Sequence, residues 1–146
     1  MTPIQAKREH RLRIANDFIR VIASHGRRFF YYQGYVTRLE VDARGRIWLV
    51  DKYMQKRVDT HRRNSRWNSF TEGGTMRGLV ESLRDYVLGR APLPLNHLGP
   101  APEWMSGGDP WGYGPVAMDA VRRECAGLEN GGGEGVVEAE DGEGAP

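Results

Sequence analysis

The pattern of hydrophobic and polar positions is clearest between residues 76 and 88. Apolar side chains recur there at the i, i+3, i+4, i+7 spacing of one helix face, at Met76, Leu79, Val80, Leu83, Tyr86 and Val87. Thr75 is a suitable N-cap residue, and Gly89 followed by Pro92 is a typical stop signal. The pattern predicts an amphipathic helix that turns one face to the core.

A second helix is predicted near the N-terminus. Residues 2–5 read Thr-Pro-Ile-Gln, the pattern of a capping box with proline at the first helical position. Apolar residues with the spacing of a core-facing helix appear only in its later turns, at Ile14, Phe18, Val21 and Ile22. Gly26 ends the helix. The charged run 7–13, KREHRLR, cannot be buried. It is either a solvated helix start or a basic arm for nucleic acid.

Residues 27–60 are predicted to form three strands. Polar and apolar residues alternate over 35–41, which favours a half-buried strand, and Gly34 suggests a bulge or a close backbone approach. The segment 42–45 suits a tight hairpin turn, 46–51 reads as a central strand, and 57–60 as a third. The sheet is therefore expected to be an antiparallel meander.

The composition changes after Arg90. Residues 91–113 are rich in proline but contain Trp104, Trp111 and Tyr113, which are expected to pin this segment to the domain surface. A short helix is predicted from Pro115, and 129–146 is acidic, Gly-rich and expected to be disordered. We therefore predict an α+β fold with three parts: a core of 1–90, a packed segment of 91–128 and a tail of 129–146.

The cysteine content and the absence of long apolar runs narrow the cellular context. The chain of 146 residues has one cysteine, so it has no internal disulfide and suits a reducing compartment. No apolar run approaches the length of a membrane span, and the N-terminus is too charged for a signal peptide. We expect a cytoplasmic protein without membrane contact.

The net charge of +2 hides an asymmetry along the chain. All 21 Lys and Arg residues lie at or before Arg123, together with 13 of the 19 acidic residues, so the body carries +8. The other six acidic residues give the tail −6. The tail is either an intramolecular competitor of phosphates for the body or a solubilising extension.

The first candidate site is a basic sheet that bears aromatic residues. Arginine and exposed aromatic side chains bind phosphates and stack on bases. The alternative is that the aromatics belong to the core, as strands favour. The predicted nucleic-acid-binding residues are Arg38, Arg46, Arg57, Arg62, Arg63 and Arg66 for phosphates, with Tyr35 or Trp48 for stacking.

The second candidate is an anion site formed by Gly73, Gly74 and Thr75. A glycine turn that enters a helix N-terminus offers free N–H groups and the positive end of the helix dipole. The alternative is a simple sharp turn with Thr75 as the cap. Glu72 opposes an anion, and no lysine follows the glycines as in a P-loop.

Catalytic and metal-binding patterns are weak. Asp59 and His61 share a strand face, but a third ligand is not apparent, so no metal site is predicted. Cys125 has helical core spacing and no activating motif. We predict no catalytic residue and no cofactor, and expect that the protein is not an enzyme.

The run from GRIWLVDKY to RWNSFTEGGTMRGLVESLRDYVLG resembles a family of short uncharacterised proteins encoded by bacteriophages and prophages. The similarity spans roughly residues 28 to 126 and includes the later Trp111-Gly-Tyr-Gly run. It implies a phage accessory gene product and no activity. The matching positions are Gly45, Arg46, Trp48, Trp67, Phe70, Gly73, Gly74, Thr75, Arg77, Leu79, Asp85 and Tyr86.

Two folds share parts of the predicted element order. Double-stranded-RNA-binding domains are α-β-β-β-α but carry a lysine cluster at their last helix, where this chain has TMRGLVE. Integrase-arm domains lay a three-stranded sheet in the DNA major groove, which suits the Arg-bearing strands better. The leading expectation is a non-enzymatic phage accessory protein that binds nucleic acid. The alternative is a protein-binding module that inhibits a host defence or transcription complex, with 91–113 offering contacts.

Overall fold

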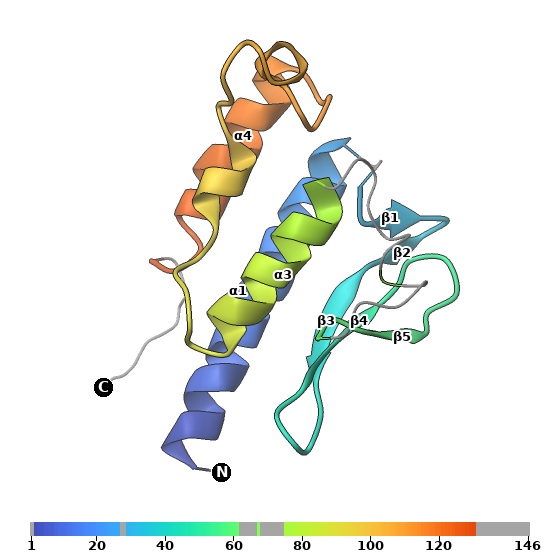
Figure 1. Ribbon diagram of the computed structural model, residues 1–146, viewed down its shortest axis with the longest axis vertical. Helices are drawn as coiled ribbons and strands as arrows, with labels where there is room; N and C mark the ends of the chain where they lie inside the picture. The colour runs from blue at the N-terminus through green and yellow to red at the C-terminus, as the bar shows by residue number, and fades with distance from the viewer. Residues whose placement is uncertain (1, 27–28, 62–66, 68–74, 131–146) are drawn as a thin grey trace.

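The computed structural model describes residues 2–26, 29–61, 67 and 75–130. Within them lie three α-helices, α1 (Pro3–Gly26), α3 (Thr75–Val87) and α4 (Pro115–Ala126), and two small antiparallel sheets. Figure 1 shows α1 as the long central element, with α3 and α4 beside it and the strands on the other side. The predicted α+β class is confirmed.

Helix α1 begins with the predicted capping box. The Thr2 hydroxyl accepts the Gln5 backbone N–H at 3.1 Å, and the Gln5 side chain accepts the Thr2 N–H at 2.8 Å. Its buried residues begin at Ile14, near the middle of the helix: Ile14, Ala15, Phe18, Ile19, Ile22 and Ala23. Figure 1 shows the first turns of α1 extending beyond the other helices, and no residue of the charged run 7–13 is buried, as predicted.

The larger sheet consists of β3 (Arg38–Val41), β4 (Ile47–Val50) and β5 (Arg57–Asp59), in that order, so β4 is central. Leu39 lies opposite Leu49, and Leu49 opposite Val58. This row is buried. The predicted meander, its central strand and the hairpin turn after β3 are confirmed.

The predicted continuous strand over 35–41 is wrong, because the chain forms a separate hairpin first. Strands β1 (Tyr31–Tyr32) and β2 (Tyr35–Val36) pair with each other, and Gln33 and Gly34 form the turn between them with φ of 46° and 86°. Gly34 is thus a turn residue rather than a bulge. Two successive positive φ values reverse the chain direction, so Tyr35 pairs with Tyr32 in the small hairpin and is exposed.

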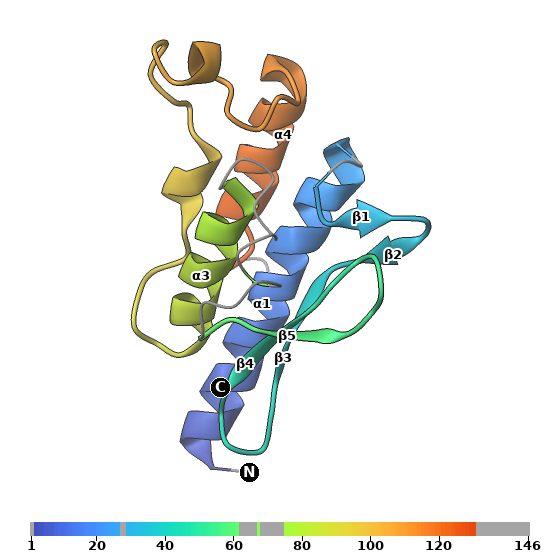
Figure 2. The same cartoon turned by 45° about the vertical axis from the view of Figure 1, so that its right-hand side comes forward.

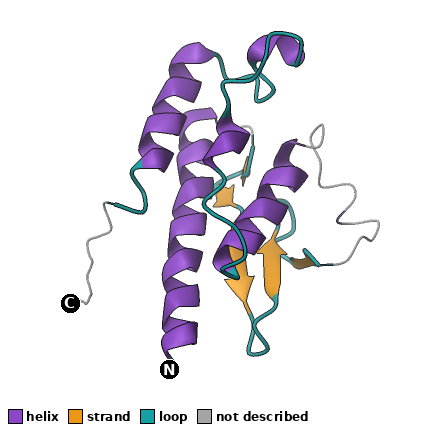
Figure 3. Ribbon diagram, turned by 60° about the vertical axis from the view of Figure 1, so that its left-hand side comes forward, coloured by secondary structure: helices purple, strands orange, loops and turns teal. Residues whose placement is uncertain are grey.

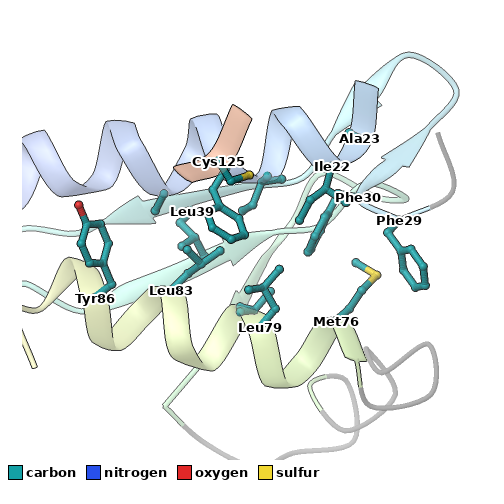
Figure 4. Packing of buried hydrophobic residues seen from close by; sticks show 14 of the residues in the cluster. Ile22, Ala23, Phe29, Phe30, Leu39, Met76, Leu79, Leu83, Tyr86 and Cys125 are labelled. Carbon is teal, nitrogen blue, oxygen red and sulfur yellow. The ribbon is translucent and has the colours of Figure 1, made fainter. Parts of the chain in front are cut away.

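Helix α3 supplies the predicted apolar face. Figure 4 shows Met76, Leu79 and Leu83 on α3 directed toward the α1 side of the core. All six residues of the sequence stripe are buried. This helix therefore joins α1 and the sheet in one core.

The segment after α3 crosses the surface through two short 3-10 helices, η1 (Leu95–Leu98) and η2 (Ser106–Gly108), before α4 (Figure 3). Trp111 is buried, packs edge-on against Phe29 at 5.0 Å and donates its indole N–H to the His97 carbonyl. Trp104 is instead 80% exposed, so it does not pin the segment as predicted. Among the described residues, no helix combines the length and the apolar character needed to cross a membrane.

Candidate nucleic-acid interface

The outer face of the larger sheet brings together four of the predicted binding residues. Strand register places Arg38, Val50 and Arg57 in one row across β3, β4 and β5. The next row contains Glu40, Trp48 and Asp59. Arg46 lies at the start of β4 and reaches Asp59.

Each of the three described arginines on this face is ion-paired. Glu40 accepts from Arg38 at 2.8 Å and from Arg57 at 3.1 Å. Partial burial opposes ionisation of Glu40, but the hydrogen bonds and charges of both arginines lower its pKa overall. Arg46 binds both oxygens of Asp59, at 3.2 and 2.8 Å. Three arginines thus face the three carboxylates of Glu40, Asp42 and Asp59, and a phosphate would have to displace a carboxylate to bind.

Trp48 is partly exposed and makes two contacts on this face, so its role in base stacking stays a prediction. Its indole N–H donates to Asp42 at 2.9 Å, and this hydrogen bond is the first cause of the lowered pKa of Asp42, ahead of the Arg46 backbone N–H. The guanidinium of Arg57 lies 5.7 Å from the centre of its ring. Trp48 therefore serves to hold the strand ends and Arg57 together.

Tyr35 lies elsewhere, in a tyrosine cluster that we define as Tyr32, Tyr35 and Tyr53. Tyr32 and Tyr35 are cross-strand partners in the β1–β2 hairpin, so their side chains share one face. Tyr53 comes from the β4–β5 loop, and its ring centre lies 4.8 Å from that of Tyr32. The three residues are 42%, 55% and 55% exposed. Figure 2 shows the hairpin and this loop on the same side of the molecule.

The loop that carries Tyr53 also carries cations. The ammonium of the buried Lys52 lies 5.2 Å from the centre of the Tyr53 ring, and Lys56, further along the loop, is exposed. Asp51, the carboxylate of this loop, is buried and accepts the backbone N–H groups of Tyr53 and Met54. The aromatic rings therefore stand beside positive charge, with the loop's own carboxylate turned inward.

Sequence reasoning missed Tyr32 and Tyr53 as site residues. A two-residue turn at Gln33-Gly34 with tyrosine on both sides is a signal that could have indicated the first pair, because the residues flanking such a turn face the same way. No local pattern links Tyr53 to them. Their contact depends on how the hairpin packs against the β4–β5 loop.

The other predicted site residues are only partly placed. Arg62, Arg63, Arg66, Gly73 and Gly74 lie outside the described residues. Thr75 begins α3 and, with Gly78, lines one wall of a groove of about 400 Å³ whose other wall comes from residues 96–111. The anion site stays a prediction.

The polar residues weighed for chemistry have structural contacts. His61 accepts the Ile47 N–H on its Nε2 at 3.3 Å, and its own backbone N–H donates to Asp59. Within the described part of the chain, no group of three His, Cys, Asp or Glu residues is placed to hold a metal ion. Cys125 is buried, and burial raises the pKa of its thiol to about 12.

These features define a small α+β protein with an exposed aromatic surface. The chain belongs to the YoqU family, whose sequence profile matches residues 5–129. This is an uncharacterised family of phage type, which confirms that part of the resemblance. No curated protein and no solved structure matches the chain.

Proposed function

We propose that this protein is a non-enzymatic phage accessory protein that acts in the host cytosol and binds single-stranded nucleic acid through its tyrosine cluster. The observation that carries the proposal is the pairing of Tyr32 and Tyr53, whose exposed rings have centres 4.8 Å apart, with the exposed Lys56 on the same loop as Tyr53. Exposed aromatic rings next to cations bind unpaired bases and the phosphates that follow them.

Unpaired bases suit this surface better than a duplex does. A tyrosine ring can stack only on a base whose face is free, and in a duplex each base face is covered by the neighbouring base pair. Tyrosine loses little conformational entropy when it is fixed, and three such residues on the β1–β2 hairpin and the β4–β5 loop offer several stacking positions. The neutral outer face of the sheet is a poorer candidate because its arginines are already paired.

The test is fluorescence anisotropy with a labelled oligothymidylate of about 12 nucleotides, a length within the range that single-strand sites cover. Tyr32→Ala and Tyr53→Ala should each weaken binding by about 5- to 100-fold, since stacking on one aromatic ring contributes about 1–3 kcal/mol. Tyr32→Phe and Tyr53→Phe are the matched controls. They keep the ring and should bind nearly as tightly as the wild type.

Salt dependence gives an independent readout at the same site. Lys56→Ala should reduce the slope of log K against log salt by about 0.7, the value of one phosphate contact in a single strand. A wild-type protein that does not bind single strands at low salt would overturn the proposal. Equal affinities of the Ala and Phe variants would also do so.

A protein partner is the second candidate, and the exposure of Trp104 favours it. Trp104 is 80% exposed and Met105 40% exposed, and Met105 also lines the groove of about 400 Å³ between α3 and residues 96–111. Trp and Met are enriched at protein interfaces. A stoichiometric host protein that survives nuclease treatment, and that is lost with Trp104→Ala, would support an inhibitor of a host defence or transcription complex.

A further inference from the structure

The first half of α1 is the most exposed and most basic element of the described fold. Residues 3–13 contain Lys7, Arg8, Arg11 and Arg13 and a single carboxylate, Glu9, so this half carries +3. Lys7 and Arg13 are exposed, whereas the buried residues begin at Ile14. Figure 1 shows these turns extending beyond the other helices.

The cations at this end have no carboxylate partners among the described residues. Lys7, Arg8, Arg13 and Arg44, which lies in the β3–β4 turn, form no ion pair there. Arg20, in the covered half of α1, is paired with Asp17. The charge of Arg20 is therefore neutralised within α1, whereas these four cations have no carboxylate partner among the described residues.

Arg8 shows that the two basic segments meet. Its guanidinium lies over the β3–β4 turn, close enough that a Cβ on Gly45 would be 2.8 Å from Nη1. Its Nε is buried, and no described residue supplies it with an acceptor. A groove of about 310 Å³ opens beside it, lined by Gln5, Arg8, Glu9, Val41, Asp42 and Ala43.

The carboxylates of this groove do not neutralise Arg8. Asp42 already accepts the backbone N–H groups of Arg44 and Arg46 and the indole N–H of Trp48. Glu9 is exposed and forms no ion pair with a described residue. An anion oxygen seated in the groove could supply the acceptor that Arg8 Nε lacks, at the expense of some repulsion from Glu9.

We infer that the first half of α1, together with Arg44 of the β3–β4 turn, binds the phosphate backbone of duplex DNA. Residues 3–13, most of which are exposed, form a helix segment about 16 Å long, which can enter a B-form major groove about 12 Å wide. The groove of duplex RNA is too narrow for a helix. This inference goes beyond single-strand binding and rests on other residues, because the β3–β4 turn and the β4–β5 loop lie at opposite ends of the sheet.

The experiment uses the full chain and a labelled DNA duplex of about 20 base pairs, with salt varied between roughly 50 and 200 mM. The triple variant Lys7→Ala, Arg13→Ala and Arg44→Ala should lower the salt slope by about 2 to 3 and weaken low-salt binding by about 10- to 100-fold. A duplex RNA of equal length should bind more weakly than the DNA.

Two controls separate this effect from loss of folding or general charge. The charge-preserving triple variant Lys7→Arg, Arg13→Lys and Arg44→Lys should bind duplex DNA like the wild type. Arg20→Ala removes one positive charge from the same helix, but at a position already paired with Asp17, and should change the slope little. Circular dichroism and thermal melting of every variant establish that α1 is intact.

The outcomes distinguish this inference from the proposed function. Duplex binding that is absent, or unchanged in the triple Ala variant, overturns the inference even if single strands bind through Tyr32 and Tyr53. Duplex binding lost in that variant supports it even if single strands do not bind. Another result would be that the wild type binds anionic phospholipid vesicles but not duplex DNA, and that the triple Ala variant loses this vesicle binding. This result would identify a membrane-binding surface and would overturn the inference.

Discussion

The Asn16 side chain of α1 hydrogen-bonds both backbone groups of Leu39 in β3. Its Oδ1 accepts the Leu39 N–H at 2.7 Å, and its Nδ2 donates to the Leu39 carbonyl at 3.1 Å. β3 is an edge strand, so these groups point away from β4 and have no strand partner. A primary amide on the helix thus replaces the missing strand, and it fixes α1 against the sheet.

Asn16→Ala should lower the free energy of unfolding by about 1–3 kcal/mol, because it leaves two partly buried backbone groups without partners. Asn16→Asp is the matched variant: it can accept from the N–H but cannot donate to the carbonyl. It should also destabilise the fold. Urea denaturation measures both variants. Wild-type stability in Asn16→Ala would show that water replaces the amide without loss.

Two helix glycines should respond to alanine in opposite directions. A Cβ on Gly26 would lie 1.8 Å from the Tyr113 ring, so Gly26→Ala must displace that ring and should cost about 1–3 kcal/mol. A Cβ on Gly78 in α3 would meet His97 at 3.7 Å, an ordinary contact. Gly78→Ala should therefore stabilise the protein by about 0.5–1 kcal/mol through helix propensity. The urea midpoint of Gly26→Ala should fall below that of the wild type, and the midpoint of Gly78→Ala should rise above it. A shift of both midpoints in the same direction would contradict the packing at Tyr113.

Sequence patterns predicted the elements that are set by local periodicity. The stripe from Met76 to Val87 and the capping box at Thr2 depend on residues within a few turns, and both are confirmed. The break at Thr37 and the β1–β2 hairpin before it were missed, because the alternation of polar and apolar residues continues through Thr37.

The charge balance of the sheet could not be predicted from the sequence either. Arg46 and Asp59, or Arg57 and Glu40, are distant in the chain and meet only through strand register. The arginines in the sequence therefore suggested a basic sheet face. In the structure, the three described arginines of that face, Arg38, Arg46 and Arg57, are each paired with a carboxylate. Arg8 and Arg44 form no ion pair with a described residue, and this could be seen only in the structure.

Stability should decrease as the pH falls below about 6.5, because His97 is partly buried. Burial lowers the pKa of His97 below its ordinary value of 6.5, and its Nε2 lies 3.0 Å from the Ser82 hydroxyl. The unfolded state then binds the proton more readily than the native state, so stability is lost between pH 6.5 and the lower native pKa and levels off below it. His10 and His61 have lowered pKa values too and act in the same direction.

His97→Gln should flatten this pH dependence in urea denaturation curves measured from pH 7 to pH 5, since glutamine does not titrate there. NMR titration of the His97 ring is the direct check. A native His97 that titrates at or above 6.5 would contradict the prediction, whatever the stability curves show.

The acidic tail starts beside the basic half of α1. Glu129 accepts a hydrogen bond from the Tyr86 hydroxyl at 2.9 Å, and burial together with this carboxylate raises the pKa of Tyr86. Burial, then Arg13 and Arg11, lower the pKa of His10, while Glu129 opposes them. Glu129 thus lies within electrostatic reach of the α1 cations. Five more acidic residues follow Glu129 in the sequence.

Removal of residues 131–146 should therefore tighten the binding of duplex DNA at low salt, by about 2- to 10-fold, because a tethered set of carboxylates competes with phosphates for the same cations. The difference should shrink as salt rises, since the screening length falls to about 8 Å at physiological ionic strength. A full-length variant with these carboxylates changed to Gln or Asn is the matched control, and it should bind like the truncated chain. If the truncated chain binds more tightly but the neutralised one does not, bulk rather than charge blocks the surface. Equal affinities of all three proteins at every salt concentration would leave the tail as a solubilising extension.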